Sequence, residues 1–145
     1  MKLRQISIFL ENKPGKLAEL IELLRKNEIN MRALSLAETT DYGIARIIVD
    51  NPEKTADILR ESSYVYSATP VIAAAIPDKP GSLYKVLDVF REGGVNIEYT
   101  YAFITRKPGY AYIVFRINDE KTDEAAELLG KNGIELVTNK DLYNL

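Results

Sequence analysis

The sequence predicts an α+β fold in which one small β-α-β-β-α-β module is used twice. The first observation behind this prediction is a repeat: Pro14-Gly15-Lys16-Leu17 returns 66 residues later as Pro80-Gly81-Ser82-Leu83, and the same offset places Gly43-Ile44-Ala45 on Gly109-Tyr110-Ala111 without a gap. The second is that apolar residues change, within each copy, between the spacing of strands and the spacing of helices. Two copies of so long a repeat indicate a duplicated domain and not a solenoid.

In the first copy, a strand comes first and a helix follows it. Apolar residues alternate from Ile6 to Leu10, which is the period of a strand with one buried face, and Asn12-Lys13-Pro14-Gly15 then interrupts it. The next apolar residues have the spacing of a helix that packs on one side: Leu17, Leu20, Ile21 and Leu24. We expect this helix to run from Lys16 to Lys26-Asn27.

A hairpin and a second helix complete the first copy. A strand at about 30–38, the turn Asp41-Tyr42-Gly43 and alternating apolar residues at 45–49 predict two antiparallel strands. We expect a helix over about 52–62, because Asn51 is a good N-cap and Pro52 is favoured at the first helical position. Residues 64–67 form a short β segment.

The second copy repeats this plan. We expect strands at about 71–76, 96–105, 109–117 and 134–138, and helices at about 82–92 and 119–131, with Gly133 as the left-handed residue after the last helix. No linker rich in Gly, Ser or Pro separates the copies, so the domains are assigned to 1–68 and 69–145. In each domain a four-stranded antiparallel sheet is covered by two helices.

Two questions stay open at this point. The buried face of the strand at 30–38 is not determined, because Leu34 and Leu36 alternate out of phase with Tyr99, Tyr101 and Phe103 in the other copy. Domains this small bury little surface, so we expect the two copies to stabilise each other and the chain to associate further, at least to a homodimer.

The composition excludes most catalytic chemistry. The chain of 145 residues has no Cys, no His and no Trp, which removes thiolate nucleophiles, imidazole bases, and the zinc and haem sites that need these ligands. We therefore expect no enzymatic activity, no cofactor and no metal. Lys and Arg number 19 against 21 Asp and Glu, too few for neutralising nucleic-acid phosphates, and no apolar stretch is long enough for a signal peptide or membrane span. We expect a cytoplasmic protein without nucleic-acid or membrane partners.

The strongest candidate for a binding site is the strand-to-helix turn, Asn12-Lys13-Pro14-Gly15 in the first copy and Asp78-Lys79-Pro80-Gly81 in the second. Glycine lets the backbone approach a ligand closely, and the N-terminus of the following helix offers free N–H groups to a carboxylate. The alternative is structural: Asn or Asp caps the helix, and Pro-Gly makes the bend.

A second element recurs at the same offset, Ile29-Asn30-Met31 and Val95-Asn96-Ile97, where the chain leaves the first helix of each copy. The end of the first strand and the start of the second are expected near the same end of that helix. Asn12 with Asn30, and Asp78 with Asn96, are therefore predicted to converge on one small polar ligand. A turn role for Asn30 and Asn96 is the alternative.

With both elements in this order and spacing, twice, the sequence resembles a tandem pair of ACT domains, small ferredoxin-like regulatory modules that bind amino acids. The family's N-x-P-G-x-L turn matches Asn12 to Leu17, with Asp78 to Leu83 as a variant, and its φ-N-φ helix exit matches the segments around Asn30 and Asn96. The resemblance implies that a free amino acid binds at an interface between two ACT domains. The ligand-binding residues that it implies are Asn12, Pro14, Gly15, Lys16, Leu17, Asn30, Met31, Asp78, Pro80, Gly81, Ser82, Leu83, Asn96 and Ile97.

The sequence also departs from the family pattern. Leu10 and Ile76 stand where the serine-binding pattern has His, which favours a less polar amino acid than serine. Asp78 can accept from a ligand ammonium but cannot donate to its carboxylate, so the two sites should not be equivalent. Six of the nine tyrosines lie in the second copy. Four of them lie on its predicted hairpin: Tyr99, Tyr101, Tyr110 and Tyr112. We expect these tyrosines to line an interface or a pocket, and the alternative is that they only pack against each other across the strands.

The function that we expect is that of a non-catalytic amino-acid sensor, whose ligand shifts its own assembly or modulates a partner. A second class is a regulatory or structural subunit of an amino-acid biosynthetic enzyme, resembling the ACT-containing small subunits of acetolactate synthase; co-purification with a large subunit would distinguish it. A third is a small enzyme on the same fold, such as an acylphosphatase. That activity needs a catalytic Arg in the turn, where this chain has Lys13 and Lys79, so we expect no phosphatase activity.

Overall fold

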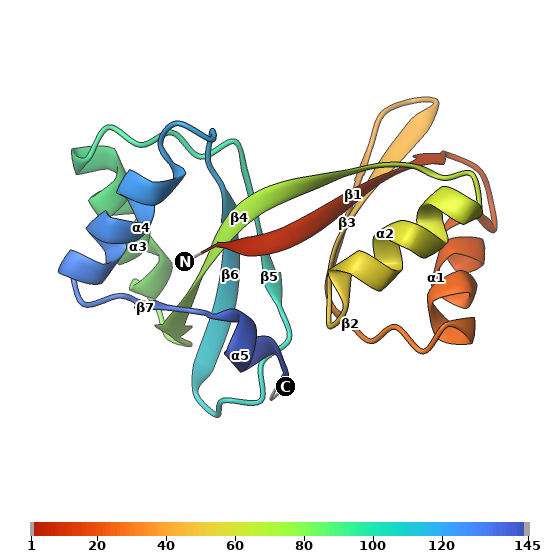
Figure 1. Ribbon diagram of the computed structural model, residues 1–145. Coiled ribbons are helices and arrows are strands. Elements are labelled where there is room, and N and C mark those ends of the chain that lie inside the picture. The colour runs from red at the N-terminus through yellow and green to blue at the C-terminus, as the bar shows by residue number, and fades with distance from the viewer. Residues whose placement is uncertain (1, 144–145) are drawn as a thin grey trace. The chain divides into compact units, whose positions relative to one another are not determined.

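The computed structural model describes residues 2–143 and groups them into two compact units. The N-terminal unit comprises Arg4–Thr69, and the C-terminal unit comprises the chain from Pro70 onward together with its start as far as Leu3. Each unit has the same order of helices and strands (Figure 1). The prediction of two β-α-β-β-α-β modules with a ferredoxin-like fold is confirmed.

The N-terminal unit contains four strands and two helices. In chain order they are β1 (Leu3–Glu11), α1 (Lys16–Lys26), β2 (Met31–Glu38), β3 (Tyr42–Val49), α2 (Pro52–Glu61) and the first part of β4 (Val65–Pro77). The strand order is β2-β3-β1-β4, and β3 pairs antiparallel with both of its neighbours. Ala45, for example, lies opposite Ile8 on one side and Leu36 on the other.

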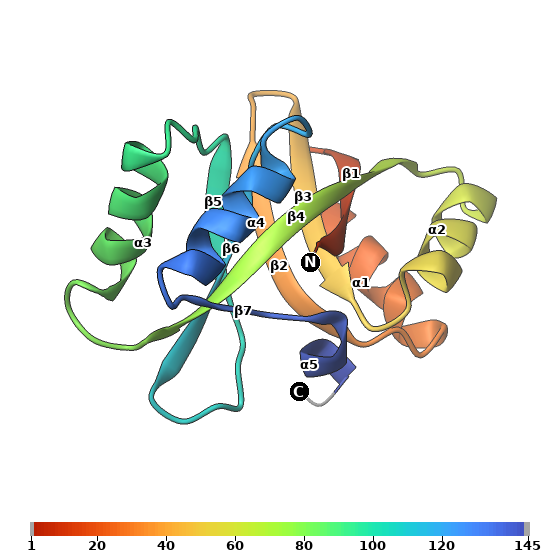
Figure 2. The ribbon, with the colours of Figure 1, turned by 60° about the vertical axis from the view of Figure 1, so that its left-hand side comes forward.

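The C-terminal unit repeats this arrangement from the second part of β4. Its further elements are α3 (Ser82–Glu92), β5 (Tyr99–Phe103), β6 (Tyr110–Arg116), α4 (Thr122–Lys131), β7 (Glu135–Leu136) and α5 (Asn139–Tyr143). Here β4 pairs with β6 and β7, and β6 pairs with β5, all antiparallel. Figure 2 shows α5 following β7 at the end of the chain.

Each unit has its own core between one face of the sheet and the two helices. In the N-terminal unit this face carries Ile6, Ile8, Leu10, Ala45, Ile47 and Val49, which pack against Leu20, Leu24, Ile58 and Leu59 of the helices. In the C-terminal unit the corresponding residues are Ile72, Ala74, Ile76 and Phe115, with Val86, Phe90, Ala125 and Leu129 from the helices. The rings of Phe90 and Phe115 meet edge to face, with centroids 5.2 Å apart.

The large apolar side chains of the second strand lie on different faces of the sheet in the two units, which explains their opposite sequence phase. Leu34 and Leu36 of β2 lie opposite Ile47 and Ala45, on the face that carries the helices. In β5, Tyr101 lies opposite Val114, which is on the other face. The pairing of β2 with β3 has a register irregularity between Met31 and Ala33.

Three sequence predictions of strands and helices are corrected. The strands expected at 64–67 and 71–76 form a single strand, β4. The last helix of the repeat begins at Thr122 instead of 119, because the Asn118 side chain accepts a hydrogen bond from the Lys121 N–H and holds the preceding residues in a turn. The strand expected at 134–138 has only two residues.

The helix α5 was not predicted, although the sequence carries a signal for it. Thr138 Oγ1 accepts a hydrogen bond from the Asp141 N–H, and the Asp141 carboxylate accepts one from the Thr138 N–H. This reciprocal pattern is a capping box with Asp at the third helical position.

Candidate functional site

The turn that follows β1 has the backbone geometry that the Pro-Gly sequence predicts. Gly15 is the N-cap of α1 with φ of 85°, and Gly81 is the N-cap of α3 with φ of 90°. Both lie in the left-handed region, where a side chain is disfavoured. Neither helix is capped by a side chain. The alternative in which Asn12 or Asp78 caps the helix is therefore wrong.

Asn12 instead fastens the turn between β2 and β3. Its side-chain amide donates to the carbonyls of Thr39 and Thr40, at 3.3 Å and 3.4 Å, and its backbone N–H donates to the carbonyl of Asp41 at 3.0 Å. The side chain is exposed. A ligand that binds the Asn12 amide must therefore share it with, or take it from, these two carbonyls.

Asp78 occupies the same place in the C-terminal unit with fewer contacts. Its backbone N–H donates to the carbonyl of Gly109 at 2.8 Å, as Asn12 does to its own hairpin. Within residues 2–143 its carboxylate has neither a hydrogen bond nor an ion pair. The carboxylate is exposed and available to an ammonium group.

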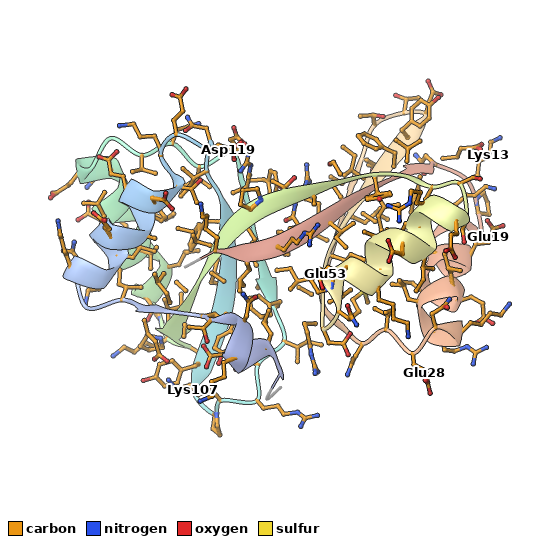
Figure 3. The ribbon with its side chains drawn as sticks, viewed as in Figure 1. Lys13, Glu19, Glu28, Glu53, Lys107 and Asp119 are labelled. Atoms are coloured by element: carbon orange, nitrogen blue, oxygen red, sulfur yellow. The ribbon has the colours of Figure 1, made fainter. Side chains whose placement is uncertain are left out.

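Asn30 lies at the other end of the helix from Asn12. Its N–H donates to Asp50 Oδ1 at 3.1 Å, and its carbonyl accepts from the Asp50 N–H at 3.0 Å, where β3 ends. An eleven-residue helix such as α1 is about 16 Å long. Figure 3 shows Lys13 and Glu28, the neighbours of these residues, at opposite ends of α1.

The predicted convergence of Asn12 with Asn30 inside one unit is therefore wrong. The same holds for Asp78 and Asn96, which precede and follow α3. In a β-α-β unit the first strand leads to the start of the helix and the second strand leaves from its end, so the two Asn positions are separated by the helix length. The turn role expected for Asn30 is not seen either, because the residue with positive φ at this helix exit is Glu28 and the backbone of Asn30 bonds to Asp50.

The turn of the N-terminal unit borders a pocket that faces β2 and β3, here called the hairpin-side pocket. Its volume is about 310 Å³, and it is lined by Leu10, Glu11, Asn12, Leu17, Leu36, Glu38 and Gly43. The pocket brings together two of the predicted ligand residues, Asn12 and Leu17. Leu36, whose side chain is half exposed, was not predicted to belong to the site.

A second kind of pocket, here called the loop-side pocket, opens on the opposite side of the turn in both units. In the N-terminal unit it has about 320 Å³ and is lined by Phe9, Glu11, Lys16, Glu19, Ser63 and Val65, among others. In the C-terminal unit it has about 460 Å³, and its lining includes Ala75, Pro77, Lys79, Lys85, Tyr110 and Glu135. Three predicted ligand residues of the second copy also line it, namely Pro80, Gly81 and Ser82.

Ion pairs near the two turns differ. In the N-terminal unit Lys13 Nζ lies 2.8 Å from Glu11 Oε2. The hydrogen bond and the charge of Lys13 lower the pKa of Glu11, and the same hydrogen bond and the charge of Glu11 raise the pKa of Lys13. In the C-terminal unit Lys107 Nζ lies 2.8 Å from Glu135 Oε2 and 4.0 Å from the centre of the Tyr110 ring. The hydrogen bond to Glu135 raises the pKa of Lys107.

Across residues 2–143, no cluster of three or more Cys, His, Asp or Glu side chains could hold a metal ion. Nor does that part of the chain contain a helix long and apolar enough to cross a membrane. The polar groups around the turns are amides, lysines, hydroxyls and single carboxylates.

The model of the ACT domain pair matches residues 1–145, the whole sequence. The chain belongs to the ACT domain pair family. No curated protein matches it. Among solved structures it is similar to protein BT0572 from Bacteroides thetaiotaomicron, with 39% identity over 100% of this chain and 98% of that chain and a TM-score of 0.91.

Two regulatory subunits of aspartate kinase share the fold at much lower identity. The subunit from Thermus thermophilus is 17% identical, with a TM-score of 0.64 over 88% of this chain and 91% of that chain. The subunit from Thermus flavus is 15% identical, with a TM-score of 0.62 over 88% of this chain and 90% of that chain. In this ACT domain pair, the two N-x-P-G-type turns lie at equivalent positions of the two modules.

Proposed function

We propose that this ACT domain pair is a non-catalytic regulatory protein that binds a free amino acid between ACT domains of two chains. Binding then modulates the protein's own assembly or a partner. The alternative that we retain from the sequence is a regulatory or structural subunit of an amino-acid biosynthetic enzyme. The observation that carries the proposal is the separation of Asn12 from Asn30. If both hold one small ligand, they must come from different copies of the module.

The edge strand β2 supports such a pairing. Among the described strands it pairs with β3 alone, so its other edge is open to a further strand. Leu34 and Leu36 are 37% and 51% exposed on the face that also carries α1. Two β2 strands related by a two-fold axis would run antiparallel and bury these leucines against each other.

An antiparallel pair of β2 strands would also complete the ligand site. Asn30 precedes β2, and Asn12 contacts the turn that follows it, so the two lie at opposite ends of a strand roughly 25 Å long. In an antiparallel pair, the beginning of one β2 lies beside the end of the other. Asn30 of the second chain would then approach the hairpin-side pocket and Asn12 of the first.

A thermal-shift panel with all proteinogenic amino acids identifies the ligand. At 100 times its dissociation constant, a ligand adds about 2.7 kcal/mol to the free energy of unfolding. For that amino acid, calorimetry should then show a loss of affinity of about tenfold to a hundredfold for Asn12→Ala, since the buried polar contact is worth about 1–3 kcal/mol. Asp78→Ala should weaken binding only at the amino-acid site of the C-terminal unit. Asn139→Ala, at an exposed Asn at the start of α5 that lines none of the pockets described above, is the control.

Mixing two variants tests whether the site is shared between chains. Asn12→Ala and Asn30→Ala should each bind weakly alone. After refolding them together, half of the dimers should be mixed, and each mixed dimer should have one intact site. Roughly a quarter of all sites should then bind with wild-type affinity. A mixture that binds no better than the separate variants would show that no shared site exists.

A further inference from the structure

The two loop-side pockets occupy equivalent places but have different linings. Residues 9, 11, 16 and 19 of the N-terminal pocket correspond, at the repeat offset, to residues 75, 77, 82 and 85 of the C-terminal pocket. In both units the loop before the last strand passes through a positive φ, 63° at Ser63 and 72° at Gly133. The pockets can therefore be compared position by position.

The C-terminal pocket is the larger of the two because small residues line it. Phe9, which is 45% exposed, is replaced by Ala75. The pocket of about 460 Å³ falls within the roughly 300–1,000 Å³ that small-molecule sites occupy. Its apolar lining comes from Ala75, Pro77, Val86 and Ile134 and from the half-buried ring of Tyr110.

The charges of the two pockets differ more than their volumes. In the N-terminal pocket, Glu11 pairs with Lys13, and Lys16 lies 3.6 Å from Glu19. The second copy has Pro77 where Glu11 stands and Lys85 where Glu19 stands. Lys79, the counterpart of Lys13, has therefore lost its carboxylate. Within the described part of the chain, Lys79 and Lys85 make no ion pair.

The remaining carboxylate of the C-terminal pocket is already neutralised. Glu135 accepts a hydrogen bond from Lys107 at 2.8 Å, and Lys107 also lies over the ring of Tyr110. The lining thus offers two uncompensated ammonium groups beside an apolar wall. An acidic group would be attracted, whereas a ligand ammonium would have to compete with Lys107 for Glu135.

We propose that the loop-side pocket of the C-terminal unit is a second ligand site, which takes a small organic anion with an apolar body. Its acidic group lies between Lys79 and Lys85, and its apolar body lies against Ala75, Pro77 and Tyr110. The pocket shares Pro80, Gly81 and Ser82 of the turn with the residues predicted for amino-acid binding, but neither Asp78 nor Asn96 lines it, so it differs from the amino-acid site proposed above in its polar groups. Carboxylates and phosphate monoesters share the required chemistry.

Amide NMR titrations of the full chain at constant ionic strength test the proposal. The probes are phenylacetate, phenyl phosphate, phenylacetamide and phenylalanine. The anions should shift amides within 75–86 and 133–135, and phenylacetamide should bind at least tenfold more weakly than phenylacetate because it has no charge. The ratio of the two anion affinities decides between a carboxylate and a phosphate ligand. Equal affinity for phenylacetamide, or shifts confined to other residues, would overturn the proposal.

Two lysine variants and one glutamate variant sharpen the test. Lys79→Met with Lys85→Met should raise the dissociation constant of phenylacetate at least tenfold, whereas Lys26→Met, an exposed lysine outside the pocket, should leave it unchanged. Glu135→Gln should tighten phenylacetate binding, because it removes a negative charge and frees Lys107. If Glu135→Gln instead weakens binding and phenylalanine binds best, the pocket is an amino-acid site and the proposal is wrong.

Discussion

The two ACT modules have kept the same backbone at their turns and have changed the groups around it. Gly15 and Gly81 differ in φ by only a few degrees, 85° against 90°, and the residue three positions earlier bonds through its N–H to the following hairpin in both units. The side chains differ: Asn12 bonds to two carbonyls, whereas the carboxylate of Asp78 is available. The two turns therefore share their backbone conformation but differ in the charge and contacts of their side chains.

The largest expected loss of stability comes from substitutions that remove a large side chain from either core. Phe90→Ala should lower the free energy of unfolding by about 3–5 kcal/mol, because Phe90 is buried and meets Phe115 edge to face. Its counterpart Leu24→Ala should cost about 2–5 kcal/mol. Urea unfolding followed by circular dichroism measures both. Two separate transitions in Phe90→Ala would show that the units unfold independently, whereas one transition would show that they unfold together.

The shared backbone predicts equal costs at the two turn glycines. Gly15→Ala and Gly81→Ala should each destabilise by about 1–2 kcal/mol, because an L-residue pays this amount in the left-handed region. A Cβ at either position would meet no atom within 4 Å, so no clash adds to the cost. Gly130→Ala in α4, where φ is not positive, is the control and should be stabilising. Unequal costs at 15 and 81 would contradict the equivalence of the turns.

Asn12 and Asp78 should differ in stability before any ligand is added. Asn12→Ala removes two long, exposed hydrogen bonds to the β2–β3 turn and should cost about 0.5 kcal/mol. Asp78→Ala removes no side-chain contact of the described residues and should be neutral. Thermal unfolding of the ligand-free variants gives the comparison. An Asp78→Ala variant that loses more stability than Asn12→Ala would refute this assignment.

The smallest expected effect is a change in the pKa of Glu11, which pairs with Lys13 beside the first turn. Lys13→Gln should raise the pKa of Glu11 toward its ordinary value of 4.5, since Lys13 lowers it. Because the folded-state pKa is lowered, Glu11 contributes stability above its unfolded pKa and loses it as the pH falls through the folded value. Carboxyl NMR titration of both proteins measures the shift. An unchanged pKa of Glu11 in Lys13→Gln would contradict this assignment.

Much of the fold was predictable because its signals are local. The Pro-Gly turns and the Asn51-Pro52 helix start each depend on a few neighbouring residues, and α1, α2 and α3 begin at their predicted residues. The Asn51 side chain accepts from the Lys54 N–H, as expected of an N-cap. The helix α5 had the same kind of local signal at Thr138 and Asp141, which sequence reasoning missed.

The candidate site was less predictable because it depends on positions that the chain brings together only in three dimensions. Asn12 and Asn30 are both recognisable in sequence, but their separation follows from the length and direction of α1. The loop-side pocket of the C-terminal unit combines Lys85, Tyr110 and Glu135, which belong to three different elements. The signal for it was available only by comparing the copies, where Glu11 and Glu19 become Pro77 and Lys85.

The strand β4 carries core residues at even-numbered positions, Tyr66 in the N-terminal unit and Ile72, Ala74 and Ile76 in the C-terminal unit. Within the C-terminal unit, a slip of one residue between β4 and β6 would turn Ile72, Ala74 and Ile76 to the opposite face of the sheet. A slip of two residues would keep them on the core face. Pairing errors of β4 with β6 are thus restricted to even steps if the core of this unit is to form.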